Sequence, residues 1–174
     1  MLYNSFAAID TFIFDVDGVM TDSALLVQEN GDLLRTMNVR DGFALKLAVT
    51  LGYNIIVITG GNSPGVKIRL EKLGIDRVYL KTFKKLEIFE DLVGSKEIDP
   101  LRTAYMGDDL IDLSVLHRVG LSAAPADAVA EVLAMVNYIS PFRGGQGCVR
   151  DLIEKVLKIQ ERWPDYTQLD SPGV

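Results

Sequence analysis

The sequence predicts an α/β fold in which a doubly wound parallel sheet is flanked by helices. Short apolar segments of strand length alternate with longer segments of helical period along the chain. One of them, NIIVIT over residues 54–59, is apolar throughout its interior, as strands buried on both faces of a parallel sheet are. At 174 residues the chain fits one domain, expected over residues 1–163 and followed by a flexible tail over 164–174.

The first expected elements are a strand and a hairpin. Residues 11–15 are β-branched and aromatic and run into an acidic loop that contains glycine, which indicates a buried strand. Residues 24–38 hold two extended segments separated by Asn30 and Gly31. Asn-Gly favours a tight turn in which both residues adopt positive φ, so we expect a β-hairpin that protrudes from the domain.

The later strands and helices are predicted from their apolar segments of strand length and their segments of helical period, and Gly, Pro or a capping residue lies at most of their boundaries. Helices are expected over residues 43–51, 66–73, 84–93, 110–119, 127–136 and 147–163. Strands are expected over residues 54–59, 77–80, 103–106, 121–124 and 138–139. In a sheet built this way, ligands bind beyond the carboxyl ends of the strands.

Composition excludes several classes of function. The chain carries 18 Lys and Arg against 24 Asp and Glu, and this net charge of −6 disfavours nucleic acid as a partner. A single cysteine, Cys148, forms no disulfide within the chain, which favours a reducing compartment. A single histidine, His117, argues against a His-ligated zinc site and a Ser-His-Asp triad. Carboxylates are therefore expected to carry any chemistry.

No targeting segment is expected. The first residues lack a basic segment followed by an apolar one, and every apolar run is far shorter than the roughly 20 residues that span a bilayer. We therefore expect a cytoplasmic protein without a membrane partner.

Residues suited to catalysis or to phosphate binding, through a side chain or a main-chain amide, cluster at the junctions between the predicted strands and the helices that follow them. In chain order they are Asp15, Asp17, Thr59, Gly60, Lys84, Lys85, Asp108, Asp109 and Asp112. Each has an ordinary structural explanation by itself, such as a helix cap or a solvated lysine. Their placement at one edge of a sheet is not explained in that way. Carboxylates that converge beside a lysine predict a Mg²⁺ ion and a phosphoryl ligand.

These residues resemble the four motifs of the haloacid dehalogenase (HAD) superfamily of phosphatases. The motifs stand here as DVDG over 15–18, Thr59-Gly60, Lys85, and GDDLID over 107–112. The resemblance implies that Asp15 is a nucleophile forming an aspartyl phosphate and that Asp17 is a general acid and then a base. The implied metal ligands are Asp15, Asp108 and the main-chain carbonyl of Asp17. The implied contacts to the phosphoryl group are Thr59, Gly60 and Lys85, and the residues that orient the lysine or a metal-bound water are Asp109 and Asp112.

The segments between the motifs leave no room for the cap domain that many HAD phosphatases carry. Something else must cover the site. The hairpin has an apolar surface made of Leu25, Leu26, Val27, Leu33, Leu34 and Met37. Either this face lies on its own domain or it contacts another copy of the chain.

Among capless members, the chain resembles the tetrameric phosphatases that act on 3-deoxy-D-manno-octulosonate 8-phosphate (KDO 8-phosphate) in lipopolysaccharide biosynthesis. The stretches DVDGVMTD over 15–22, NVRDG over 38–42 and GGQGCVR over 144–150 carry this resemblance. It implies a homotetramer with shared active sites, in which the glycine-rich stretch closes over an active site. A sugar-acid substrate also needs arginines for its carboxylate, and the candidates are Arg40, Arg150 and, less favoured, Arg143.

Two alternatives to this substrate stay open. Many family members have a charged residue after the Thr-Gly pair, whereas this chain has Gly61-Asn62-Ser63, so a nine-carbon ulosonate 9-phosphate or another sugar-acid phosphate is a second possibility. A receiver-like signalling module also combines Mg²⁺ with aspartates, a threonine and a lysine. It is disfavoured, because such modules place the phosphorylated aspartate after a later strand.

Overall fold

The computed structural model describes residues 2–165, and its six parallel strands form one sheet. The strands are β1 (Thr11–Phe14), β4 (Asn54–Ile58), β5 (Arg77–Tyr79), β6 (Thr103–Met106), β7 (Leu121–Ala124) and β8 (Tyr138–Ile139). The helices are α1 (Leu2–Ala8), α2 (Val39–Thr50), α3 (Pro64–Lys72), α4 (Lys85–Gly94), α5 (Leu113–Leu116), α6 (Ala130–Leu133) and α7 (Cys148–Ile159). Two 3₁₀ turns are η1 (Pro100–Arg102) and η2 (Leu110–Asp112), and a separate hairpin pairs β2 (Leu26–Val27) with β3 (Leu33–Leu34).

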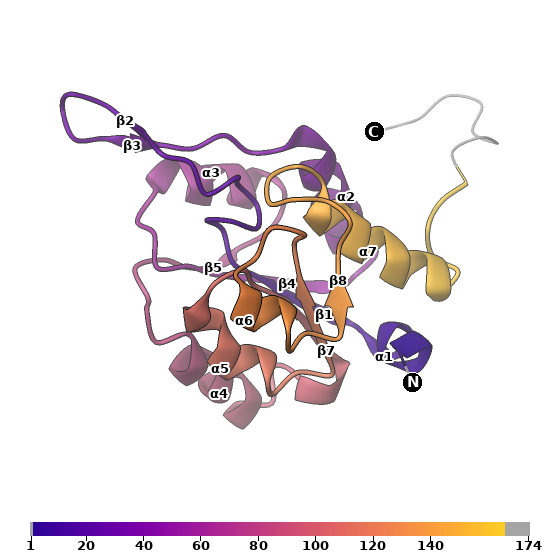
Figure 1. Ribbon diagram of the computed structural model, residues 1–174. Helices are drawn as coiled ribbons and strands as arrows, with labels where there is room; N and C mark the ends of the chain where they lie inside the picture. The colour runs from indigo at the N-terminus through magenta and orange to yellow at the C-terminus, as the bar shows by residue number, and fades with distance from the viewer. Residues whose placement is uncertain (1, 166–174) are drawn as a thin grey trace.

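Alternation along the strands divides the core into two layers. On β1, Phe12 and Phe14 pack with the core beneath α1, α2, α3 and α7, whereas Ile13 packs with the core beneath α4, α5 and α6. Residues of β4 and β6 alternate in the same way, because successive side chains of a strand point to opposite faces. Figure 1 shows α4 and α5 on one side of the sheet and α2 and α7 on the other. The predicted doubly wound α/β class is confirmed.

The strand order β5-β4-β1-β6-β7-β8 brings the reactive residues together. The chain first adds strands on one side of β1 and then, with β6, on the other side. The order reverses beside β1, and in open α/β sheets ligands bind at such a switch point beyond the carboxyl ends of the strands. Phe14 pairs with Met106 at that end, so the residues that follow β1 and β6 start as neighbours.

Some boundaries differ from the sequence expectations. Helix α2 begins at Val39, ahead of the expected residue 43, because the Asn38 side chain accepts a hydrogen bond from the Arg40 amide at 2.8 Å and caps the helix. The expected helix 110–119 is divided into η2 and α5, and the expected helix 127–136 is reduced to α6. Helix α1 was not expected. Only its Phe6 is buried, against Tyr138, so its apolar pattern is weak.

The hairpin forms, but its turn differs from the expected one. Gly31 has φ +86°, whereas Asn30 does not have positive φ. The Asn30 side chain instead accepts a hydrogen bond from the Asp32 amide at 3.0 Å, and the Gln28 amide donates to the Asp32 carbonyl at 2.9 Å. The loop is therefore longer than two residues, and a single left-handed glycine is sufficient to close it.

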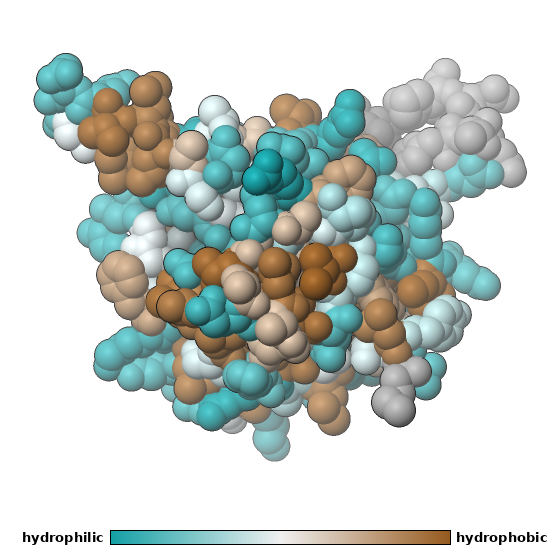
Figure 2. Space-filling view, viewed as in Figure 1, coloured by the Kyte–Doolittle hydropathy of each residue, from teal (hydrophilic) through white to brown (hydrophobic). Residues whose placement is uncertain are grey.

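Apart from Met37, which packs against the core, the apolar hairpin face does not lie on its own domain. Leu26 and Val27 are each 66% exposed, and Leu33 and Leu34 are exposed as well. Figure 2 shows these side chains as a brown patch on the hairpin, which extends away from the body. The alternative in which the domain covers this face is therefore wrong for the isolated chain.

The glycine-rich stretch lies against the loop after β1 in its own chain. A Cβ on Gly144 would come within 2.0 Å of the Gly18 carbonyl oxygen, so only glycine fits there. The Gly145 amide donates to the Val19 carbonyl at 2.9 Å. Cys148 is buried, and its thiol also donates to this carbonyl. The stretch thus supports the loop that carries the first acidic motif.

Helix α7 takes its amino-terminal cap from another helix. Its own N-cap residue is Gly147, which has no side chain to offer. The buried Asp41 of α2 accepts a hydrogen bond from the Arg150 amide at 2.8 Å instead. Burial raises the pKa of Asp41, and hydrogen bonds from the Arg150 and Gly147 amides oppose that effect. A negative side chain at this position also suits the helix dipole. None of the helices within residues 2–165 has the length and apolar character needed to cross a bilayer.

Replacing the carboxylate in Asp41→Ala is expected to lower the free energy of unfolding by about 1–3 kcal/mol, because buried amides of α7 lose their acceptor. Urea denaturation followed by circular dichroism measures this. Asp76→Ala, at an exposed position, is the control and should change stability by less than about 0.5 kcal/mol. Equal stabilities for the two variants would contradict the capping role of Asp41.

Candidate active site

Asp15 is the first residue after β1 and is held on three sides. Its amide donates to the Met106 carbonyl at 3.1 Å, which continues the sheet ladder by one step. One carboxylate oxygen, Oδ1, accepts from the Val16 amide at 2.6 Å, and the other, Oδ2, lies 2.7 Å from the Lys85 Nζ. Asp15 is only 5% exposed. Its carboxylate is therefore fixed at the carboxyl edge of the sheet.

Lys85 joins two carboxylates, one directly after β1 and one in η2. It is the first residue of α4, is 1% exposed, and lies 2.7 Å from oxygens of both Asp15 and Asp112. Burial lowers the pKa of Lys85, but the charges of Asp112 and Asp15 outweigh burial and hold that pKa above its usual value. The adjacent Lys84 is exposed and pairs with Glu87. Of the two candidate lysines, only Lys85 reaches the site.

Asp112 has both oxygens occupied by protein donors. Its Oδ1 accepts from Lys85 and from the Tyr105 hydroxyl at 2.5 Å, and its Oδ2 accepts from the Asp108 amide at 3.1 Å. The Asp109 amide adds a longer hydrogen bond of 3.3 Å. Asp112 is therefore arranged to orient the lysine and the loop after β6. The Asp109 carboxylate caps η2 by accepting from the Leu110 amide, and it is not one of the carboxylates that converge with Asp15.

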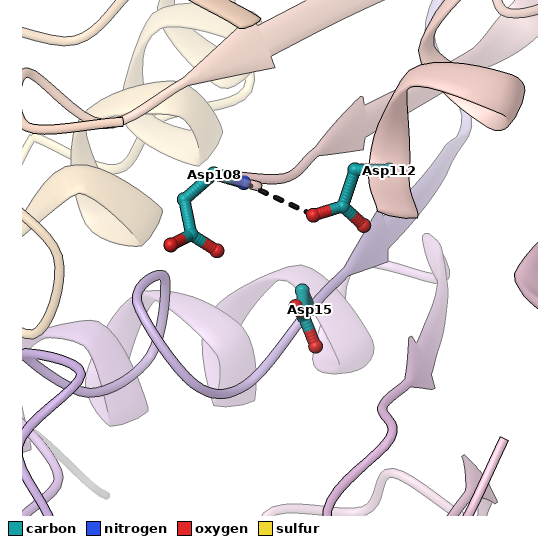
Figure 3. A group of neighbouring side chains, drawn as sticks. All are labelled: Asp15, Asp108 and Asp112. Carbon is teal, nitrogen blue, oxygen red and sulfur yellow. Dashed lines mark hydrogen bonds between the residues drawn. The ribbon is translucent and has the colours of Figure 1, made fainter. Parts of the chain in front are cut away.

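Asp108 completes a group of three carboxylates that fits a divalent cation. Asp15, Asp108 and Asp112 each offer an oxygen, and these atoms lie within 4.8 Å of one another (Figure 3). The Asp108 Oδ1 is buried and has no hydrogen-bond partner among the described residues. A Cβ on Gly18 would come within 1.9 Å of the Asp108 Oδ2, so the glycine leaves room for this carboxylate. Hard oxygen ligands of this kind suit Mg²⁺.

The pKa values of this group reflect its excess of negative charge. Burial raises the pKa of Asp15 to about 6, with Lys85 opposing and Asp112 reinforcing the rise. Burial also raises the pKa of Asp108 to about 8, reinforced by Asp15, Asp112 and Asp109. Burial and the nearby carboxylates raise the pKa of the Tyr105 hydroxyl, which stays a hydrogen-bond donor. One lysine does not balance these charges, and a bound cation would lower both carboxyl pKa values.

Asp17 is paired with an arginine that sequence reasoning missed. The Arg35 Nε lies 2.6 Å from Asp17 Oδ1, and its Nη2 lies 3.0 Å from Asp17 Oδ2. Arg35 follows β3 in a segment whose sequence signals only a hairpin. Its distance from Asp17 along the chain gave no indication of the contact.

Thr59 and Gly60 follow β4 beside this pair. Thr59 is buried, and its hydroxyl oxygen accepts from the Gly61 amide at 3.1 Å. Thr59, Gly61, Asp17 and Arg35 lie around the same narrow space. A Cβ on Gly60 would meet the Phe83 ring at 3.0 Å, so the backbone there is closely covered on one side. The loop thus combines a hydroxyl with closely approaching main chain, as phosphoryl-binding loops do.

A large hollow of about 980 Å³ opens next to this loop, between the hairpin and the start of α3. Arg35 and Arg69 are the two arginines in its lining, and the loop residues Gly60 and Gly61 form part of its wall. Its position beyond the carboxyl end of β4 makes it a candidate for the non-phosphate part of a ligand.

Comparison with known proteins agrees with this geometry. The family described as haloacid dehalogenase-like hydrolase matches residues 71–150. The 3-deoxy-D-manno-octulosonate 8-phosphate phosphatase of Yersinia pestis is 36% identical over 94% of this chain and 87% of its own. That of Escherichia coli K12 is 39% identical over 85% of this chain and 79% of its own. The chain belongs to this phosphatase family of HAD-like hydrolases.

One solved family member is a complex with a metal ion and two small molecules. The phosphatase of Moraxella catarrhalis was crystallised with a magnesium ion, a phosphate ion and a KDO molecule. It superposes on this chain with a TM-score of 0.88 and 30% identity, covering 92% of each chain. The resemblance inferred from the four motifs is thereby confirmed, and this family member is a phosphoric monoester hydrolase. A receiver-like signalling module is not supported.

The arginines expected for the substrate carboxylate lie elsewhere in this HAD-like phosphatase. Arg40 and Arg150 line a separate hollow of about 520 Å³ beside α7. The Arg150 Nε donates to Glu154 at 3.0 Å, and its guanidinium lies over the rings of Phe43 and Trp163. The third candidate, Arg143, is exposed and pairs with Asp127. Within one chain, none of them lines the hollow beside Asp17.

The raised pKa of Asp108 predicts how the metal-free protein responds to pH. The folded state holds the Asp108 proton up to about pH 8, whereas the unfolded chain releases it near pH 4, so the free energy of unfolding falls as pH rises between these values. Asp108→Asn removes this effect and should raise stability at pH 8 by more than about 1 kcal/mol. Urea denaturation in the presence of a chelator measures the change.

The same variant should lose the rise in unfolding temperature that Mg²⁺ produces in the wild type. Asp109→Asn removes the same charge one position along the chain, where the carboxylate only caps η2, and should keep most of that rise. A full magnesium response from Asp108→Asn would exclude Asp108 as a metal ligand.

Proposed function

We propose that this phosphatase hydrolyses KDO 8-phosphate to KDO and inorganic phosphate with Mg²⁺ as its cofactor. The carboxylate group around Asp15 carries the proposal, because it joins a fixed nucleophile, a buried lysine and an unpartnered carboxylate oxygen. The substrates named for the relatives from Y. pestis and E. coli, and the ligands of the M. catarrhalis structure, support this substrate.

In the first step, an Asp15 oxygen attacks phosphorus while the bond from phosphorus to the sugar oxygen breaks. The product is an aspartyl phosphate, and the departing sugar oxygen takes a proton from Asp17. Lys85 neutralises charge on the phosphoryl oxygens, and Asp112 holds the lysine in place for this role. The Thr59 hydroxyl and the Gly60 amide bind the phosphoryl oxygens.

In the second step, Asp17 removes a proton from water, whose oxygen attacks the phosphorus of the aspartyl phosphate. Phosphate leaves and the Asp15 carboxylate is restored, so the acid of the first step is the base of the second.

The metal ligands are the carboxylates of Asp15 and Asp108 and the main-chain carbonyl of Asp17. That carbonyl accepts no hydrogen bond from the described residues, which leaves it free for this role. When bound, Mg²⁺ neutralises the repulsion between the carboxylate nucleophile and the phosphate dianion. Asp109 contributes its amide to Asp112, so we assign it a supporting role in the loop rather than a contact with the ion.

We further propose a homotetramer with shared active sites. The exposed apolar hairpin face is the surface that another copy would cover. Arg40 and Arg150 would reach a substrate carboxylate across such a boundary, because they line no part of the hollow beside Asp17 in their own chain. We also propose that the enzyme acts in the cytoplasm, in lipopolysaccharide biosynthesis.

A second candidate substrate is a nine-carbon ulosonate 9-phosphate. Gly61 lies in the wall of the large hollow and has no side chain to contact a sugar acid, so the nine-carbon substrate stays a second candidate. Phosphate release across eight- and nine-carbon ulosonate phosphates, with and without Mg²⁺, distinguishes the two. We expect the highest kcat/KM for KDO 8-phosphate and no release without the metal, and a higher value for a nine-carbon ester would overturn the eight-carbon assignment.

Asp15→Asn should lower kcat by more than about 1,000-fold with the fold intact, because the amide is no nucleophile. Phosphate release and circular dichroism measure the two properties. Asp10→Asn is a matched control at the opposite end of β1, where the aspartate forms an exposed pair with Arg102. Residual turnover above one tenth of the wild type would remove Asp15 as the nucleophile.

The double variant Leu26→Asp with Val27→Asp should convert the tetramer to smaller species, because it places charge on the exposed hairpin face. Light scattering coupled to size exclusion measures the mass. Ile68→Asp, at an exposed apolar position on α3, is the control and should keep the wild-type mass. A wild type that is monomeric at micromolar concentration would contradict the shared-site proposal.

A further inference from the structure

Arg35 connects the hairpin to the catalytic edge of the sheet. The strands β2 and β3 are exposed, whereas the Arg35 side chain is only 6% exposed. The guanidinium meets the Asp17 carboxylate with two hydrogen bonds, of 2.6 and 3.0 Å, one to each oxygen. This two-point geometry fixes the plane and direction of a carboxylate, which a single ammonium contact does not do.

Gly61 provides the space for this pair. A Cβ at position 61 would lie 3.1 Å from the Asp17 Oδ2, 3.2 Å from the Arg35 Nη2 and 3.4 Å from the Thr59 hydroxyl oxygen. Gly61 does not have positive φ, so alanine fits its backbone conformation. Any side chain there would press on both partners of the ion pair at once. The glycine and the hairpin arginine therefore form one arrangement around Asp17.

We propose that Arg35 is the positioning residue for Asp17. Gly61, which has no side chain, leaves room for the Arg35 guanidinium. This inference rests on the proposed acid-base role of Asp17. Arg35 holds the Asp17 carboxylate in one orientation next to Thr59 and Gly61 before the substrate arrives. To act as the acid, Asp17 takes up a proton on one oxygen and gives up one of the two guanidinium hydrogen bonds, while the other bond keeps its orientation. In the first step this proton passes to the sugar oxygen, and the guanidinium keeps its own protons. Arg35 acts through Asp17 and touches no reacting atom.

This role predicts a dependence on the leaving group. A sugar alkoxide is a strong base and needs a well-placed acid as the bond from phosphorus to oxygen breaks. The p-nitrophenolate ion leaves without protonation, so hydrolysis of p-nitrophenyl phosphate makes little demand on the acid. An arginine that bound the phosphoryl group, or that merely supported the fold, would affect both esters alike.

The test compares kcat and KM for KDO 8-phosphate and p-nitrophenyl phosphate in Mg²⁺. For Arg35→Ala we expect kcat on the sugar ester to fall by about 10- to 100-fold, kcat on the aryl ester to change less than about threefold, and KM to change little. Arg35→Lys should recover part of the loss on the sugar ester. Lys67→Ala also removes one positive charge, from an exposed pair with Glu71 on α3, and is expected to match the wild type.

Three results would overturn the inference. Equal losses of kcat on the two esters would assign Arg35 to the phosphoryl group or to the fold. A rise in KM with unchanged kcat would assign it to substrate binding. Wild-type kinetics in Arg35→Ala would show that Asp17 needs no such partner.

Gly61→Ala tests the same arrangement without removing the arginine, and it serves if Arg35→Ala does not fold. It should lower kcat on the sugar ester by about threefold or more and spare the aryl ester. In the Arg35→Ala background the added methyl group should have no further effect, because the partner that it crowds is gone. Additive losses in the double variant would overturn the link between Gly61 and Arg35.

Failure of the proposed substrate is distinguishable from failure of this inference. A wild type that hydrolyses p-nitrophenyl phosphate but not KDO 8-phosphate would refute the substrate alone. The kcat values of Arg35→Ala and the wild type would then be compared on p-nitrophenyl phosphate and on any alkyl sugar phosphate that the wild type accepts. A wild type that releases phosphate from no ester in Mg²⁺ would refute the proposed function and the role of Arg35 together.

Discussion

The concentration of negative charge at one edge of the sheet is the constraint on which the rest of the site depends. Three carboxylates from the ends of β1 and β6 approach one another, and the buried Lys85 balances only part of their charge. The remaining charge appears in the raised pKa values of Asp15 and Asp108. This excess of negative charge favours the binding of a hard cation. With that cation bound, an acidic protein can bind an anionic phosphate ester.

The protein holds this edge in place with contacts between segments that are far apart in sequence. Gly144 and Gly145 pack on the loop after β1, Asp41 of α2 caps α7, and Asp112 collects donors from α4, β6 and its own loop. Apart from the amides of Asp112's own loop, these contacts join segments that are separate in the sequence, so they tie the acidic loops to several parts of the fold. Asp15, the proposed nucleophile, consequently lies on a rigid framework, whereas the hairpin extends into solvent.

The hairpin links this framework to the outside of the molecule. Its apolar strands are exposed, and its stem carries the guanidinium that meets Asp17. In an assembly of the kind proposed, the same segment would face another copy at its tip and the acid-base carboxylate at its stem. Substrate access and proton transfer would then both depend on one short element. A capless phosphatase has few other ways to enclose its substrate, because its core is fully used by the sheet and its helices.

The sequence by itself determined the fold class, most elements and the acidic motifs, because hydrophobic period and residue order are local properties. Strands 103–106, 121–124 and 138–139 agree with β6, β7 and β8 residue for residue. The motif resemblance already selected Lys85 over Lys84, and the tertiary structure agrees with that choice. The tertiary structure alone decided that Asp109 caps η2 and that Arg35 meets Asp17. It also decided that Arg40 and Arg150 lie in a different hollow. These outcomes depend on which segments fold beside one another, and spacing along the chain carries no information about that.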